Sequence, residues 1–132
     1  MFEKREPLLP AEQEEVVTSV IACGITVHRE LGPGFKEAIY QKAVCLELDS
    51  RGISFETEKK IEVRYKQWRI PGQRIDLIVG CVVLVEIKAV SKVKRLHQKQ
   101  VVSYLKTTGL RVGLLMNFNS VLFKHGLRRI VL

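Results

Sequence analysis

The middle of the chain contains the sequence RIPGQRIDLIVGCVVLVEIKAV at residues 69–90. It is rich in Val, Ile and Leu, as strands buried within a sheet usually are. A break near residues 80–81 divides it into two extended runs, 69–79 and 82–90. Charged side chains interrupt the apolar stretches 75–79 and 82–90 at three positions, which are Asp76, Glu86 and Lys88.

The three charged side chains point to a common site. Successive side chains of a strand alternate between its faces, so Glu86 and Lys88 share one face. Charges inside apolar strands are unfavourable unless they pair or bind something. Two carboxylates can hold a hard cation such as Mg²⁺ or Mn²⁺, and a lysine can orient water or stabilise developing charge. This pattern predicts Asp76 and Glu86 as metal ligands and Lys88 as a catalytic residue for phosphodiester hydrolysis. The alternative is a simple Glu86–Lys88 ion pair beside an unrelated Asp76.

The site also imposes a register on the two strands. A two-residue turn at residues 80–81 would pair Val79 with Val82, and Asp76 would then lie opposite Val85. Glu86 would face away from Asp76, and no site could form. Function therefore predicts a three-residue loop at residues 80–82, or a bulge near Asp76. Gly80 can supply the positive φ that such a loop or bulge needs.

The remaining elements follow from periodicity and from glycine and proline signals. Helical spacing predicts a helix over about 10–31, a second over 35–51 with Gly52 just beyond its end, and a third over 92–107 that ends at Gly109. Alternation or apolar runs predict strands over 61–65 and 111–118, and a final pair over 121–124 and 128–132. The order ααβββαβββ implies an α/β or α+β fold with a central mixed sheet. We expect one domain over residues 10–132 after an irregular lead over 1–9.

Composition limits the function further. The 132 residues carry 22 Lys and Arg against 14 Asp and Glu, a formal net charge of +8, which favours polyanionic partners such as nucleic acid. The three cysteines and three histidines are scattered and predict neither disulfides nor a zinc site. No run is long enough for a membrane helix and the N-terminus lacks a signal-peptide core, so we expect a cytoplasmic protein with no membrane partner.

Several motifs resemble a known family. Residues 34–40 (GFKEAIY) reproduce the Gly-x-x-Glu-x-x-Tyr signature of the GxxExxY protein family, and residues 28–34, 85–90 and 100–119 are similar to that family as well. The resemblance covers roughly residues 12–131. It implies a PD-(D/E)XK nuclease fold, a restriction-endonuclease-like core with a mixed four-stranded sheet flanked by helices. The chain departs from the pattern at Ile75, because a literal Pro-Asp would place proline there.

The resemblance also suggests further site residues. Glu37 matches the motif acid and would join the metal site, although an acid in a first helical turn also complements the helix dipole. Gln100 and Tyr104 are similar to the Gln-x-x-x-Tyr element of RecB-like nucleases, which places Gln100 in the catalytic site; we expect Tyr104 in the core. A basic stripe of Lys92, Arg95 and Lys99 could follow nucleic-acid phosphates or be an ordinary solvated face.

Two aromatic residues near the middle of the chain allow two interpretations, base stacking or completion of a sheet face. Tyr65 and Trp68 flank Lys66 and precede Arg69, and aromatics interleaved with bases can stack on nucleobases. Completion of a sheet face is the interpretation that we favour for them.

Together these features predict a Mg²⁺- or Mn²⁺-dependent nuclease acting on nucleic acid, with DNA favoured over RNA. The alternatives are a non-catalytic binding or adaptor module that keeps the nuclease fold, and an interaction protein with a basic surface. The intact set of Asp76, Glu86 and Lys88 favours the enzyme. A homodimer is compatible with so small a domain.

Overall fold

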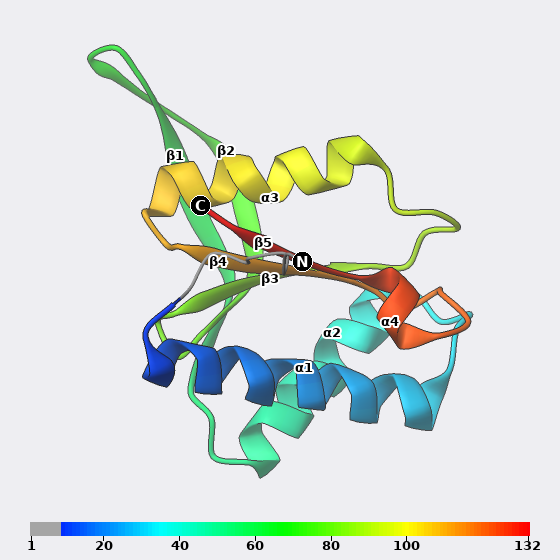
Figure 1. Cartoon of the computed structure of the whole chain (residues 1–132). Coiled ribbons are helices and arrows are strands. Elements are labelled where there is room, and N and C mark those ends of the chain that lie inside the picture. The colour runs from blue at the N-terminus through cyan, green and yellow to red at the C-terminus, as the bar shows by residue number, and fades with distance from the viewer. Residues whose placement is uncertain (1–8) are drawn as a thin grey trace, which may run out of the picture.

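The computed structural model describes residues 9–132, in which five strands form one mixed sheet with helices on both faces (Figure 1). In chain order the elements are α1 Ala11–Leu31, α2 Glu37–Ser50, β1 Phe55–Tyr65, β2 Trp68–Val79, β3 Val83–Lys88, α3 Arg95–Thr108, β4 Val112–Asn117, α4 Phe123–Gly126 and β5 Leu127–Val131.

The sheet has the order β1-β2-β3-β4-β5, and β3 and β4 are its parallel pair. The other neighbours are antiparallel. Helices α1 and α2 lie on one face and α3 on the other (Figure 1). Two apolar clusters result, one under α1 and α2 and a smaller one under α3. The central strands β3 and β4 are therefore covered on both faces, which explains why their sequences are almost continuously apolar.

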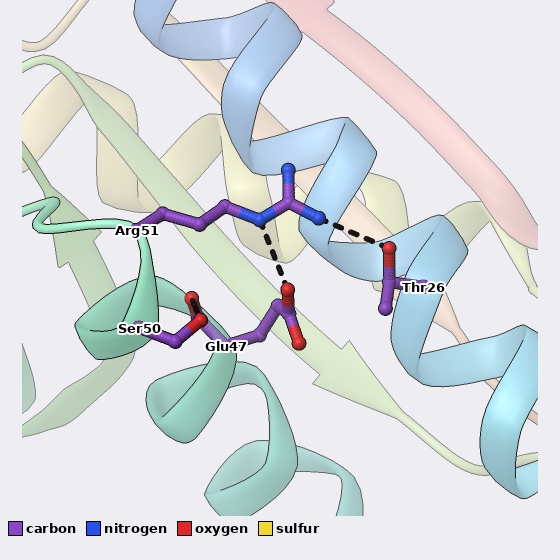
Figure 2. Close-up of polar contacts among 4 residues, drawn as sticks. All are labelled: Thr26, Glu47, Ser50 and Arg51. Atoms are coloured by element: carbon purple, nitrogen blue, oxygen red, sulfur yellow. Dashed lines mark hydrogen bonds and ion pairs between the residues drawn. The ribbon is translucent and has the colours of Figure 1, made fainter.

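Helices α1 and α2 are joined to each other at the end of α2. Figure 2 shows Arg51, whose Nε lies 3.0 Å from a carboxylate oxygen of Glu47, while a terminal nitrogen donates to Thr26 Oγ1 on α1 at 3.0 Å. Ser50 Oγ donates to the carbonyl of Glu47 at 2.8 Å. Gly52 follows with φ +70°, so the chain leaves the helix through a left-handed residue as predicted.

The structure confirms the predicted α/β class and most elements, and it corrects three of them. Strand β1 begins at Phe55, six residues before the predicted start, because its charged first half pairs with β2 although it covers little core. Helix α3 begins at Arg95 and not at Lys92, because the His97 ring accepts the backbone N–H of Lys94 and caps the helix there.

The third correction concerns residues 121–124, which do not form a strand. Val121 and Leu122 are exposed, and Phe123 starts the short helix α4. The Phe123 ring packs between the rings of His28 and Phe118. The apolar run therefore inserts one aromatic side chain into the core and pairs with no strand in the part of the chain that the structure describes.

The lead predicted over residues 1–9 lies outside the described residues except for Leu9, which is buried in the larger cluster. Over residues 9–132, no helix combines the length and apolar character needed to span a membrane.

Candidate active site

The loop between β2 and β3 has the length that the site requires. Val79 pairs with Val83 and Leu77 with Val85, so residues 80–82 form a three-residue loop. Gly80 has φ +59° and Cys81 φ +58°. Continuing the register by one pair places Asp76 opposite Glu86. The predicted shift of one residue is confirmed.

The strands β2 and β3 separate just beyond this register. Their pairing ends at Leu77 and Val85, and the N–H of Ile87 donates to Asp76 Oδ2 at 2.8 Å. A side chain thus takes the hydrogen bond that a neighbouring strand would normally accept. Ile75 and Ile78 both pack in the cluster under α3, so the alternation of β2 is broken around Asp76. Asp76 is held where the two strands part.

Glu86 and Lys88 lie beside this opening. The carboxyl of Glu86 is buried, with the residue 5% exposed, and its Oε2 lies 3.3 Å from Lys88 Nζ. Its Oε1 is buried without a hydrogen-bond partner among residues 9–132. Burial, and then the charge of Asp76, raise the pKa of Glu86 to about 7, against the opposing effect of Lys88. The site therefore holds a carboxylate whose charge is only partly compensated by the protein.

The other two acids experience the same environment. Burial raises the pKa of Asp76, although the N–H of Ile87 opposes the shift. Burial and the charge of Asp76 raise the pKa of Glu37, while Lys88 and a hydrogen bond with the Ala89 backbone lower it. Glu37 reaches this cluster from the first turn of α2. Acids on three separate elements thus interact electrostatically with Lys88.

The Gly-x-x-Glu-x-x-Tyr motif explains how Glu37 is positioned. Tyr40 is fully buried and stacks on Phe118, with ring centroids 4.8 Å apart. Its hydroxyl donates to the Gly32 carbonyl at 2.5 Å and accepts the N–H of Phe35 at 3.1 Å. These bonds fix the loop before α2, so the helix starts at Glu37 and its acid faces the site.

A buried asparagine that sequence reasoning missed supports the segment after Lys88. Asn117 is 1% exposed at the end of β4. Its Oδ1 accepts the N–H of Val90 at 2.9 Å, and its Nδ2 donates to the Val90 carbonyl at 2.9 Å. The signal was present in the sequence as one amide within an apolar strand, because buried polar groups are normally bonded.

The residues predicted on α3 divide between site, core and surface. Tyr104 is in the core as expected; burial, followed by the charges of Glu86 and Asp76, raises its pKa to about 12. Its hydroxyl shares a hydrogen bond with the side chain of Gln100. Gln100, Lys99 and Lys88 line one pocket of about 470 Å³. This places Gln100 next to Lys88.

The basic stripe is only partly present. Lys92 lies in the loop before α3, so it does not share a helical stripe with Arg95 and Lys99. All three side chains are exposed. They remain candidates for phosphate contacts, Lys99 above all because it lines the pocket that contains Lys88.

A larger groove of about 1220 Å³ leads into the site. It is lined by Glu37, Asp76 and Glu86, and also by residues of the β1–β2 hairpin and of the end of α3. Gln73, for which the sequence predicted no role, lines both the groove and the smaller pocket. Its Oε1 is buried and makes no hydrogen bond within the described chain.

The residues present fit a hard divalent cation. Glu86 Oε1 has no hydrogen-bond partner among residues 9–132, and burial raises the pKa values of three neighbouring acids, so a bound cation would stabilise their charged forms. Carboxylate oxygens are the ligands that Mg²⁺ prefers. Among residues 9–132, however, no three His, Cys, Asp or Glu side chains already converge on one point. A cation would be held by one or two carboxylates with water completing its shell, as is usual for Mg²⁺.

The comparison with family models agrees with this geometry. A model described as the PD-(D/E)XK nuclease superfamily matches residues 14–130. The chain belongs to the PD-(D/E)XK nuclease superfamily. No match was found among curated proteins or among solved structures. In this superfamily member Ile75 precedes Asp76, at the position where a literal Pro-Asp would have proline. Ile75 is fully buried, so its side chain contributes to the core.

Proposed function

We propose that this PD-(D/E)XK protein is a metal-dependent nuclease that hydrolyses phosphodiester bonds in DNA, and that it is a member of the GxxExxY family. The observation that carries the proposal is the environment of Glu86. A carboxylate that is 5% exposed, with one oxygen unpartnered among residues 9–132, sits where β2 and β3 separate, next to Asp76 and Lys88. A purely structural ion pair would not need a second acid or an open groove beside it.

Each residue has a chemical role in this proposal. Asp76 and Glu86 would hold Mg²⁺ or Mn²⁺, with Glu37 as a further ligand or as a partner of a bound water. The cation supplies Lewis-acid polarisation of the scissile phosphate and a lowered pKa of bound water. Asp76 is kept in position by the N–H of Ile87. These carboxylates need the cation as well, because without it they repel the phosphate.

Lys88 and Gln100 act on the reacting groups directly. Lys88 carries a positive charge 3.3 Å from Glu86 and is mostly buried, so it can hold an attacking water or stabilise charge on the phosphate. Gln100 lines the same pocket and can donate to a phosphate oxygen. Lys99, with Arg95 and Lys92 nearby in sequence, would bind neighbouring phosphates. The cytoplasmic location and a homodimer stay predictions.

The decisive experiment is a substrate panel with matched variants. Labelled single-stranded, duplex and branched DNA and the corresponding RNAs are incubated with Mg²⁺, with Mn²⁺ or with EDTA. We expect cleavage of DNA that needs the metal. Asp76→Asn and Lys88→Met should each lower its rate by about a hundredfold or more, whereas the exposed Lys124→Met should not. Binding without cleavage under every condition would favour the adaptor alternative.

A further inference from the structure

The hairpin formed by β1 and β2 extends well beyond the rest of the sheet (Figure 1). Strand β2 pairs with β3 only near its C-terminal end, at residues 77–79, so its first half has β1 as its strand neighbour. The register of β1 and β2 shifts at Ile61 and Glu62, opposite Pro71 and Gly72. Such a bulge increases twist and turns the outer part of a hairpin away from the sheet. We call residues 63–70 the arm tip.

The arm tip carries an exposed aromatic pair. Tyr65 and Trp68 are cross-strand partners, with exposures of 53% and 54%. Their rings stack with centroids 6.2 Å apart and an interplanar angle of 17°. They belong to neither apolar cluster and cover one face of the hairpin only by stacking on each other. Large exposed apolar groups that do not stabilise the fold usually mark an interaction surface.

The charge of the arm tip indicates the kind of partner. Its eight residues include three basic side chains, Arg64, Lys66 and Arg69, and no acidic one. Lys66 Nζ lies 5.4 Å from the centroid of the Tyr65 ring. Cations interleaved with flat aromatic surfaces suit a polyanion with stacking bases. Arg69 also lines the groove that contains Asp76 and Glu86, so the arm tip and the site border one continuous space.

We propose that the arm tip is a base-stacking site for an unpaired stretch of the nucleic acid whose backbone continues along the groove to the catalytic acids. The inference rests on the proposed nuclease function and assigns it a substrate with single-stranded character. An unpaired base is required because the faces of a base within a duplex are covered by its neighbours. Trp68 and Asp76 are eight residues apart on β2. At about 3.3 Å per residue, an extended strand would place their Cα atoms at most about 26 Å apart, which sets the scale of the distance between the stacked base and the site of cleavage.

The chain offers a direct probe, because Trp68 is its single tryptophan. Tryptophan emission is followed while three ligands are added without metal, so that nothing is cut. The ligands are a single-stranded oligonucleotide, a blunt duplex of the same sequence, and inorganic polyphosphate as a polyanion that lacks bases. We expect the single strand to quench the emission strongly and the duplex weakly. Polyphosphate should leave it unchanged.

Variants separate stacking from a change in folding. Trp68→Leu keeps an apolar side chain without a π-face and should weaken single-strand binding by about 5- to 150-fold, whereas Trp68→Phe should retain most of the affinity. Val121→Ala is the control, since it removes another exposed apolar group, 82% exposed, at the α4 end of the molecule. Binding is measured by fluorescence anisotropy of a labelled oligonucleotide.

The outcomes distinguish this inference from the proposed function. Tight binding with unchanged Trp68 emission and an unchanged affinity of Trp68→Leu would overturn the arm-tip site and leave the nuclease proposal intact. Absence of any nucleic-acid binding would overturn both. Emission that shifts with protein concentration alone would assign the aromatic pair to contact with a second copy of the chain, and the base-stacking site would be wrong.

Discussion

Strand β2 passes through two very different environments, one buried and one exposed. The contrast shows that the meaning of a polar residue depends on its burial. The end of β2 near Asp76 lies beside the buried strands β3 and β4. There, Asn117 on β4 makes defined hydrogen bonds, and Glu86 on β3 keeps one oxygen without a partner in the described chain. The beginning of β2 pairs with β1 in the outer part of the hairpin, which we call the arm (residues 59–75), and charges such as Glu62 on β1 and Arg69 on β2 are exposed to solvent there. A buried charge must be compensated, whereas an exposed one is screened by water. The same residue types therefore point to chemistry in one region and to surface recognition in the other.

The largest expected difference between the two regions concerns pH. The pKa of Glu86 is raised to about 7 in the folded protein from an ordinary value of 4.5. Between these values the folded state keeps a proton that the unfolded state has lost, so stability is present at low pH and declines as pH rises to 7. The loss is up to about 3 kcal/mol for the metal-free protein. Urea unfolding across this range measures it.

Two controls sharpen this prediction. Glu86→Gln should remove the part of the decline that Glu86 causes and leave the part due to Asp76 and Glu37, whose pKa values are also raised. Saturating Mn²⁺ should reverse the decline at pH 8 because a ligand that binds the folded state stabilises it. Glu62→Gln, on the exposed arm, should leave the decline unchanged. If both variants behaved alike, the contrast between buried and exposed acids would not hold.

A smaller difference is expected for the amides. Asn117→Ala removes both hydrogen bonds to Val90 and should lower the free energy of unfolding by about 2 kcal/mol. It should also reduce cleavage, because the segment after Lys88 loses its anchor. Gln67→Ala at the arm tip should change stability by less than about 0.5 kcal/mol. Chemical denaturation of the two variants measures both values, and an equal effect would contradict a specific role for Asn117.

The tyrosines allow a finer comparison. Tyr40→Phe keeps the stacked ring but loses the hydroxyl bonds to Gly32 and Phe35, which should lower stability by about 1 kcal/mol. Because the loop before Glu37 loosens, metal affinity should fall as well, as calorimetry with Mn²⁺ would show. Tyr65→Phe, the same change on the arm, should alter neither quantity. Unchanged metal binding in Tyr40→Phe would mean that the motif serves folding alone.

The smallest effect is expected for a single surface charge. Lys99→Ala should reduce the slope of log affinity against log salt concentration by about one unit, because one phosphate contact is lost. Lys124→Ala, on α4, should leave the slope as it is. Equal slopes for wild type and Lys99→Ala would make the exposed bases of α3 an ordinary solvated face.

Local chemistry made much of the fold predictable. The helices α1 and α2, the apolar strands and the glycine after α2 follow from periodicity and from backbone preference, which act over a few residues. The requirement that Asp76 meet Glu86 was sufficient to predict a shift of one residue, through a three-residue loop at residues 80–82 or a bulge near Asp76, and the structure has the loop. The start of β1 and the helix at Phe123 were not predictable in this way, since each depends on a partner distant in sequence.

The sequence by itself thus determined the α/β class, the elements that carry Asp76, Glu86 and Lys88, and a basic surface charge. Only the tertiary structure decided how these groups interact. Burial raises the pKa of Glu86 and leaves its Oε1 without a partner in the described chain; the separation of β2 from β3 directs Asp76 to the N–H of Ile87; and projection of the hairpin leaves Trp68 exposed. Desolvation and exposure depend on everything that surrounds a side chain, and a pattern along one strand cannot contain that information.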